Sequence, residues 1–559
     1  MTGGLMNLTA WGNENIVLFG NPKKTFFNAA YKKITNFGLQ RFRINYEGSR
    51  VLNFNTPTFL EFKVPRYAEL LYDTYLCISL PHIYSPFFFD NSELTVDNEI
   101  VKGISGNVLR PYEFRWVEDL GCNMIKEVEI YSGGTTLARY SGEYLNCMKE
   151  RDYSESKKKL WNNMTGNTKE LNDPANANGR VNIYPNSMYV DNTGVEPSIR
   201  GRKIYVPLNA FFCNNSKLAL PLVALQYQEI NIKITLEPLT KLYTINDVNS
   251  VTNSSGISWR IAPNPNILEH QMWHFLQPPS DVLASTNLYD TTRNDWNSDV
   301  HLIGTYIFLG QDERRMFAQQ PHNILIKQVQ EYEHLSIAGS QLLDIDSKNL
   351  VSNYMLRFRR SDAFLRNEWS NYSNWAYNNV IPQPVADYLP QYLNSNNELT
   401  ELGNPNMFHI TGPIGSYAYN QKNILLDMAI VLQGVYREQL LDSGIYDYVE
   451  KFKRTSGGAK EGLYCYNFCL NSNRNDYQPS GAINMNKFSK ISIEFNTIEP
   501  PFNPQGSIVE VICDISNNPI GFRKNVGTLN DYNYDLRIFE ERYNIMSITG
   551  GRLGLQYAE

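Results

Sequence analysis

The chain has 559 residues, with 51 Lys and Arg against 57 Asp and Glu, so its net charge is −6. A charged fraction of only 19% with an acidic balance lacks the clustered cations that binding to a nucleic-acid backbone requires. The length excludes a single small domain and predicts roughly three domains, or two β-rich domains enlarged by loops.

Seven cysteines are scattered along the chain without a CxxC pair. This pattern fits neither a disulfide framework nor a zinc ribbon, so we expect no metal and no other cofactor. The N-terminal residues lack a basic segment followed by a long apolar stretch, and no run approaches 18 apolar residues. We therefore expect a protein kept in a reducing, cytosol-like compartment.

Predicted strands dominate the chain, because apolar residues alternate with polar ones and aromatic and β-branched residues are frequent. In chain order the strands are predicted at 39–48, 56–64, 74–81, 124–133, 203–212, 229–238, 301–310, 323–337, 352–360, 423–434, 461–470, 488–496, 507–515 and 536–548. Helical patterns are few and short, at 141–150, 312–320 and 440–453.

The two halves repeat the same order of elements. Segments 124–148 and 424–449 each contain a strand, a tight turn, a basic residue and a helical turn. Strands 301–310 and 536–548 close the two halves. Such a repeat indicates a duplicated β-domain.

The fold class predicted from this repeat is all-β. We expect two consecutive eight-stranded antiparallel jelly-roll sandwiches with long loop insertions and a few short helices. The first jelly roll is predicted at 26–320, with insertions at 149–202 and 239–300, and the second at 321–559. These insertions are polar but carry aromatic residues, so we expect them to fold against those aromatics or a neighbouring chain and to form an exposed functional surface.

Catalytic motifs are weak throughout. His270 and His274 have the spacing of a zinc-binding helix, but Gln271 stands where the metalloprotease base would be. The chain has no GxxxxGK[ST] phosphate loop and no GxSxG elbow, and Ser480 lies in a predicted turn without a nearby His or acid. The sequence therefore predicts no enzyme and no catalytic residue.

Two other features suggest contacts. Phe87, Phe88 and Phe89 are consecutive, and three neighbouring residues of one strand cannot all face the same core. They predict either a subunit interface or a strand buried on both faces. The C-terminal GGRLG (550–554) follows a strand and predicts a tail that packs closely on a neighbour.

Several segments together carry a resemblance that covers nearly the whole chain. Residues 20–48 resemble the opening "GNP…TFF…Y…TNF" run of the major capsid proteins of nucleocytoplasmic large DNA viruses. Further similar segments follow in the family's order: 125–134, 204–234, 311–330, 366–375, 477–488 and 543–558.

The resemblance implies a double jelly roll whose three copies form a pseudo-hexagonal capsomer. Such homotrimers tile an icosahedral shell around an internal membrane and a double-stranded DNA genome, and assemble in the host cytoplasm. It also implies that segment 1–25 lies at the base, near minor capsid proteins or the membrane, and that the long loops point outward, where they contact the host surface. Segment 354–364 departs from the family's apolar strand through Arg357, Arg359 and Arg360, so the resemblance leaves its strand register open.

Two alternatives remain. A minor capsid or scaffold protein would have a similar fold. A carbohydrate-binding or hydrolytic β-sandwich is the other, since jelly rolls also form lectins and glycosidases. A glycosidase needs two carboxylates roughly 5 to 10 Å apart. Glu229 and Glu237 would lie about 26 Å apart on one strand at 3.3 Å per residue, which disfavours hydrolysis.

Overall fold

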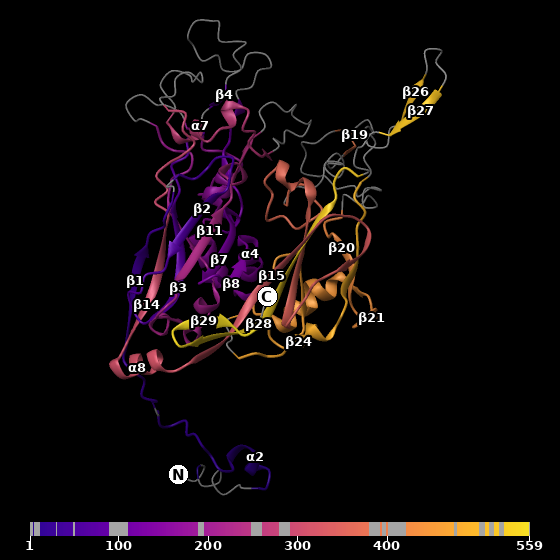
Figure 1. Ribbon diagram of the computed structural model, residues 1–559. Helices are drawn as coiled ribbons and strands as arrows, with labels where there is room; N and C mark the ends of the chain where they lie inside the picture. Colours follow the sequence, from indigo (N-terminus) through magenta and orange to yellow (C-terminus); the bar gives the residue numbers. More distant parts are fainter. Residues whose placement is uncertain are drawn as a thin grey trace.

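The computed structural model describes most of the chain. The described residues are 4, 12–29, 31–48, 51–85, 87–88, 110–187, 195–246, 260–278, 291–378, 392–393, 399–400, 421–474, 478–501, 509–513, 519–524 and 530–557. Strands predominate and helices are short. Two sandwiches lie side by side, the first in indigo to magenta and the second in orange to yellow (Figure 1).

The first sandwich contains two antiparallel sheets. One sheet has the order β1 (Phe37–Ile44), β14 (His301–Leu309), β3 (Leu70–Ser79) and β10 (Leu220–Pro221), with β9 (Lys203–Pro207) also paired to β3. The facing sheet has the order β2 (Thr58–Lys63), β11 (Ile230–Leu236), β7 (Ile125–Ser132) and β8 (Thr135–Tyr140).

The second sandwich repeats this arrangement. One sheet has the order β15 (His322–Ile337), β28 (Tyr534–Thr549), β17 (Leu350–Arg360) and β23 (Leu463–Asn467), extended by β24 (Ile483–Asn484) and β29 (Arg552–Leu555). The facing sheet has the order β16 (Ser340–Asp344), β25 (Ile491–Thr497), β20 (Leu425–Leu432) and β21 (Val435–Tyr436), with β22 (Leu441–Asp442) paired to β20.

Strand order is therefore the same in both halves. The eight main strands of each half can be counted along the chain, with β9 as the sixth strand of the first half. In both halves, strands one, eight, three and six form one sheet, and strands two, seven, four and five form the other. This is the order of a jelly roll, and it confirms the predicted fold class. The last strands of the halves, β14 and β28, occupy equivalent central positions as the sequence repeat predicted.

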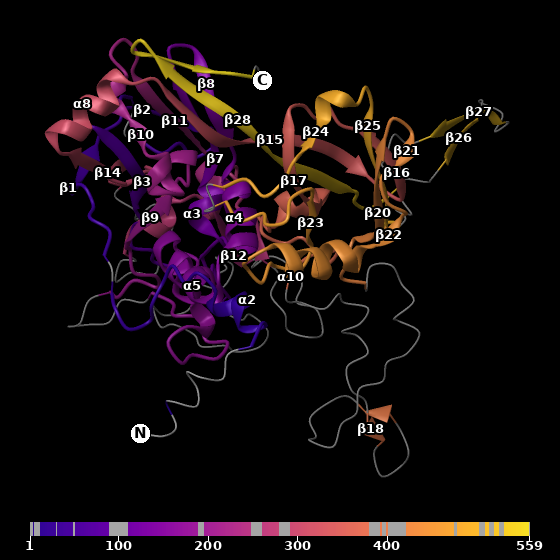
Figure 2. The same cartoon turned by 90° about the horizontal axis from the view of Figure 1, so that it is seen from below.

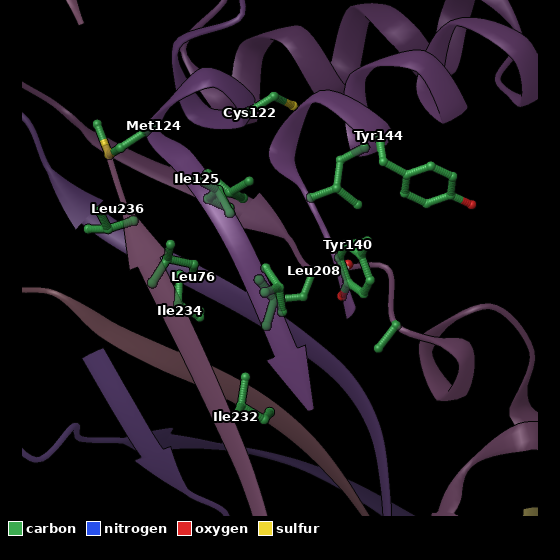
Figure 3. Packing of buried hydrophobic residues seen from close by; sticks show 14 of the residues in the cluster. Leu76, Cys122, Met124, Ile125, Tyr140, Tyr144, Leu208, Ile232, Ile234 and Leu236 are labelled. Carbon is green, nitrogen blue, oxygen red and sulfur yellow. The ribbon is translucent and has the colours of Figure 1, made fainter. Parts of the chain in front are cut away.

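The cores follow from simple alternation. In β11 the side chains of Ile230, Ile232 and Ile234 are buried, because every second residue of a strand faces the same side. Figure 3 shows Ile232 and Ile234 in one cluster with Leu76 of β3, on the opposite sheet. A separate cluster that includes Leu356, Phe358 and Ile538 fills the second sandwich.

Three helices were predicted and are present: α4 (Gly142–Asp152), α8 (Gln311–Gln319) and the segment formed by the π-helix η12 (Ile445–Val449) with α10 (Glu450–Arg454). The structure adds α5 (Glu155–Thr165) and α6 (Lys169–Asn172) within 149–202. Trp161 of α5 is buried and packs on Tyr153, with ring centroids 5.5 Å apart. Much of this insertion is thus folded around its own aromatic residues.

The remaining described α-helices and strands are short. They are α2 (Asn15–Phe19), α3 (Leu120–Met124), α7 (Trp273–Leu276) and the strands β4 (Phe87–Phe88), β5 (Arg110–Pro111), β6 (Arg115–Trp116), β12 (Tyr243–Asn246), β13 (Arg260–Ile261), β18 (Tyr392–Leu393), β19 (Leu399–Thr400), β26 (Val509–Cys513) and β27 (Pro519–Lys524). The segment that contains α2 extends away from both sandwiches (Figure 1). None of the described helices is long and apolar enough to cross a membrane.

Candidate functional site

The junction between the two sandwiches is the most elaborate polar site in the described part of the chain. Helix α4 of the first sandwich lies against the sheet β15-β28-β17-β23 of the second (Figure 2). Ser141 caps the helix by accepting a hydrogen bond from the Tyr144 backbone N–H at 3.2 Å. The backbone N–H of Ser141 in turn donates to Glu331 of β15 at 2.7 Å, which fixes the start of the helix on the second sandwich.

Glu143, in the first turn of α4, binds three arginines of the second sandwich. Its carboxylate accepts hydrogen bonds from Arg357 at 2.6 Å, Arg537 at 3.0 Å and Arg359 at 3.3 Å. Burial alone would raise the pKa of Glu143, but the three guanidinium groups outweigh it and lower the pKa to about 2. The carboxylate is therefore ionised at neutral pH and neutralises part of the arginine charge.

A second ionic cluster lies at the other end of α4. Arg151 donates to Asp152 at 2.7 and 2.8 Å, to Glu541 of β28 at 2.8 Å and to Asn353 of β17 at 2.9 Å. The side chains of Arg151, Asp152 and Glu541 have no solvent exposure. A buried charge is tolerated only when it is paired and hydrogen-bonded, so each of these groups depends on the others.

Tyr144 extends this cluster. Its hydroxyl donates to Glu541 at 2.6 Å and accepts from Arg474 at 2.6 Å. Burial raises the pKa of Glu541 in isolation, but the nearby cations Arg151, Lys327 and Arg474 lower it well below its usual range. The junction thus holds an ionised carboxylate out of contact with water.

Apolar contacts surround the two ionic clusters. Met355, Leu463, Cys465 and Phe539 lie on the outer face of the second sandwich, yet they belong to the same buried cluster as the core of the first. The ring of Phe539 lies 5.8 Å from that of Tyr144. This sheet of the second sandwich is therefore covered on both faces, which joins the two sandwiches into one body.

The junction also explains the register of the arginine-rich strand β17. In β17, Leu356 and Phe358 face the core of the second sandwich, whereas Arg357 and Arg359 face Glu143. Arg360, at the end of the strand, lies 3.5 Å from the ring centroid of Tyr532 and binds Asp362. The register that the sequence left open is set by the partner across the junction.

The segment 366–375, which carries part of the sequence resemblance, also contributes to the junction. Asn367 donates to the carbonyl oxygens of Thr240 and Tyr243, each at 2.8 Å. The indole N–H of Trp369 donates to the carbonyl oxygen of Lys241 at 2.8 Å, and its ring lies 5.2 Å from the guanidinium of Arg359. This loop therefore fastens the second sandwich to the first.

A groove of about 760 Å³ runs beside the junction. Its walls carry similar numbers of acidic and basic side chains, among them Lys126, Glu127, Arg139, Glu331, Glu333 and Arg537. Charges of both signs neutralise one another along these walls. We assign no ligand to it.

The residues that the sequence proposed lie elsewhere. Phe87 and Phe88 form β4, which pairs with β5, but their side chains and the whole of Phe89 lie outside the described residues. His270 and His274 lie on two separate short helices, and no cluster of three potential metal ligands occurs among the described residues. The C-terminal hairpin packs on the first sandwich, where the Leu553 N–H donates to Gln228 at 2.6 Å.

Sequence reasoning missed the junction residues, although one signal was present. The strand LRIFEERYNI contains Glu540, Glu541 and Arg542 between apolar residues, and none of the three exceeds 3% exposure. Consecutive charges inside a central strand predict that both faces are buried and that charged partners exist. Their partners could not be named, because Arg151, which binds Glu541, lies 390 residues away in the sequence.

Two jelly rolls in one chain are the fold of the double jelly-roll capsid proteins. The solved PBCV-1 capsid protein, fitted into a reconstruction of the Sputnik virophage, has this fold: it is 18% identical, with a TM-score of 0.57, and the match covers 96% of this chain and 100% of that one. Family profiles described as "Major capsid protein N-terminus" and "Large eukaryotic DNA virus major capsid protein" match residues 25–273 and 313–554. The chain belongs to the family of major capsid proteins of large eukaryotic DNA viruses.

Curated relatives agree with this assignment. The major capsid protein of Chrysochromulina ericina virus is 28% identical over 342 residues, which are 59% of this chain and 52% of that protein. The chain thus spans about half the length of that relative. The major capsid protein of Paramecium bursaria Chlorella virus 1 is 24% identical over 566 residues and is matched over the full length of both chains.

Proposed function

We propose that this chain is the building block of an icosahedral virus shell and acts as a homotrimer with a pseudo-hexagonal outline. The observation that supports this is the junction: it makes one rigid body from two sandwiches of equal strand order. Three copies supply six similar sandwiches, so an object with three-fold symmetry has a nearly hexagonal edge that packs in a plane. No catalytic step is part of this function.

The proposal includes a division of the chain. Residues 1–25 form a base segment, 26–320 the first jelly roll with insertions at 149–202 and 239–300, and 321–559 the second. In the base segment Val17 and Leu18 are 86% and 80% exposed, and in the following residues Phe27 is 99% exposed. Apolar side chains this exposed need a cover, which we assign to minor capsid proteins or the internal membrane at the base of the shell.

Other contacts belong to the same proposal. Neighbouring capsomers pack along the hexagonal edges, and the outer loops face the host surface. Phe87, Phe88 and Phe89 remain candidates for a subunit contact. We place the finished protein in the virion and its assembly in the host cytoplasm.

Light scattering of the purified protein tests the proposal. A homotrimer has three times the chain mass of 64.3 kDa, about 193 kDa. Particles of that mass with a hexagonal outline in negative-stain images support the proposal. A monomer at micromolar concentration contradicts it and favours a minor capsid protein or a carbohydrate-binding sandwich, which a glycan-array screen then separates.

A further inference from the structure

The two sandwiches share a sequence motif at the start of equivalent helices. Ser141 and Gly142 lie at the start of α4, and Ser443 and Gly444 lie at the start of the segment η12–α10. Each pair is followed by one residue and then by Tyr144 or Tyr446. An ungapped alignment from this motif equates Lys149 with Lys451. Both are buried and both bind their own half of the chain, through Asp119 and Asp447 respectively.

The same alignment equates two junction residues of α4 with exposed residues, while the junction residue Tyr144 corresponds to the buried Tyr446. Cys147 corresponds to Val449 and Arg151 to Lys453. Cys147 and Arg151 are fully buried against the second sandwich, whereas Val449 is 53% exposed and Lys453 is also exposed. Phe452, beside Lys453, is 89% exposed. We call Val449, Phe452 and Lys453 the helix face.

The sheets that receive these helices can also be aligned, because each contains a bulge at the same place. In the second sandwich Glu541 pairs with Asn353 and Arg542 with Val351, so one residue is skipped. In the first, Thr305 pairs with Asp73 and Tyr306 with Leu71, so one residue is again skipped. Counting from the bulges equates Asn353 with Asp73, Met355 with Tyr75, and Phe539 with Ile303.

These equivalent positions differ in burial. Asn353, Met355 and Phe539 are completely buried by α4 and its surroundings. Asp73, Tyr75 and Ile303 are only partly buried, and Tyr205, on the neighbouring strand β9, is 38% exposed. We call these last four residues the sheet face. In the second sandwich this sheet surface is covered by α4. The equivalent surface of the first sandwich has no such cover within the described part of the chain.

The sheet face belongs to the first sandwich and the helix face to the second. In both views β14 and β3 lie on the left, and in Figure 2 α10 lies to their right (Figures 1 and 2). One chain cannot bring them together, but two chains arranged head to tail can. Such a heterologous contact forms a closed ring when its rotation permits.

Charge complementarity supports this pairing. Within the described part of the chain, no Lys, Arg or His nitrogen lies within 4 Å of the Asp73 carboxylate, and Lys453 forms no ion pair. Burial raises the pKa of Asp73, and the charge of Arg41 offsets this only in part. The equivalent pair inside the chain, Arg151 and Asn353, is hydrogen-bonded at 2.9 Å.

We propose that the helix face of one copy docks on the sheet face of the next copy and repeats the internal junction, with Lys453 paired to Asp73 across the subunit boundary. The proposal rests on the homotrimer proposed above and names the surfaces that form it. Each trimer then contains six junctions of one design, three within chains and three between them.

Charge exchange tests the pairing in the full-length protein. Lys453→Asp and Asp73→Lys each place like charges at the boundary, so we expect the mass measured by light scattering to fall from about 193 kDa toward the 64.3 kDa of one chain. The double variant restores the opposite charges in exchanged positions, and we expect it to recover the trimer. Lys159→Asp, a charge reversal at an exposed lysine of α5 outside both faces, is the control and should stay trimeric.

The outcomes separate the two proposals. A monomeric wild-type protein contradicts the proposed function. A trimeric wild type whose mass is unchanged by Lys453→Asp, or a double variant that is no more trimeric than the single ones, contradicts only this inference. Lys453 is exposed and unpaired, so its variant folds and decides the question even where Asp73→Lys lowers the yield; circular dichroism confirms folding in each case.

Discussion

Helix α4 and the helical segment η12–α10 begin with the same Ser-Gly-x-Tyr motif but have opposite environments. Residues of α4 such as Arg151 and Cys147 are fully buried between two sandwiches, whereas Val449 and Lys453 of the second helix are exposed. Helix α4 thus packs on a sheet of the same chain, whereas the segment η12–α10 has no such sheet beside its exposed residues among the parts of the chain that the structure describes. From this difference we infer that the exposed residues of η12–α10 are one half of a junction whose other half lies on a second copy.

The ionic composition of the two positions differs accordingly. The internal junction keeps Arg151 and Glu541 out of water, where each ion is costly unless it is paired. At the second helix a lone Lys453 remains solvated in the separate chain. Assembly removes water from the charges of this surface, and each ion that is buried costs desolvation energy. A subunit contact with one ion pair therefore costs less to form than one with a network of ions.

Removal of Arg151 should have the largest effect. Arg151→Ala leaves Asp152 buried without its cation and removes the ion-pair partner of Glu541, so we expect a loss of about 3–5 kcal/mol in the free energy of unfolding. Urea unfolding followed by tryptophan fluorescence measures it. The matched variant Lys453→Ala weakens association but leaves the fold of each chain intact. Its free energy of unfolding should therefore differ from wild type only by an amount that depends on protein concentration. Equal losses in both variants, independent of concentration, would contradict the comparison.

Glu143→Gln should have a smaller effect that depends on pH. The pKa of Glu143 is about 2 in the folded chain, below its usual value of 4.5, so its ionised form stabilises the fold above about pH 4.5. We expect a cost of about 3 kcal/mol at neutral pH. The difference from wild type should shrink as the pH falls from 5 toward 2. Glu196→Gln, an exposed control, should show no such trend.

Trp369→Phe should have the smallest effect. The substitution keeps the aromatic ring near Arg359 but removes the hydrogen bond from the indole N–H to the Lys241 carbonyl oxygen. We expect a loss of about 1 kcal/mol, measured by thermal unfolding. A loss as large as that of Arg151→Ala would show that the loop, rather than the ionic clusters, dominates the junction.

Much of this fold was predictable from sequence. Alternation located most of the strands of both sandwiches, and the repeated order of elements predicted two jelly rolls. The prediction missed β8, which follows a glycine turn, and α5, whose sequence ESKKKLWNNMT is too polar to show a helical pattern. Lys158 and Trp161 of α5 are buried by tertiary contacts that no local pattern contains.

The junction was not predictable, for a physical reason. Its pairs join residues that are distant in sequence, such as Arg151 with Glu541, and a single charged residue carries no sign of its partner. The arginines of β17 looked like a departure from an apolar strand. Two of them, Arg357 and Arg359, bind Glu143 on the other half of the chain.

The central claim is that one junction design is used both within and between chains. Cross-linking of Asp73→Cys to Lys453→Cys in one chain with a short bismaleimide tests it most directly, because the Cα atoms of a Lys–Asp ion pair lie farther apart than a disulfide can bridge. We expect a covalent ring that runs as a single trimer band in denaturant, whereas each single variant stays monomeric there. Absence of any cross-link while the protein remains a trimer, or an open ladder of larger species, would contradict the claim.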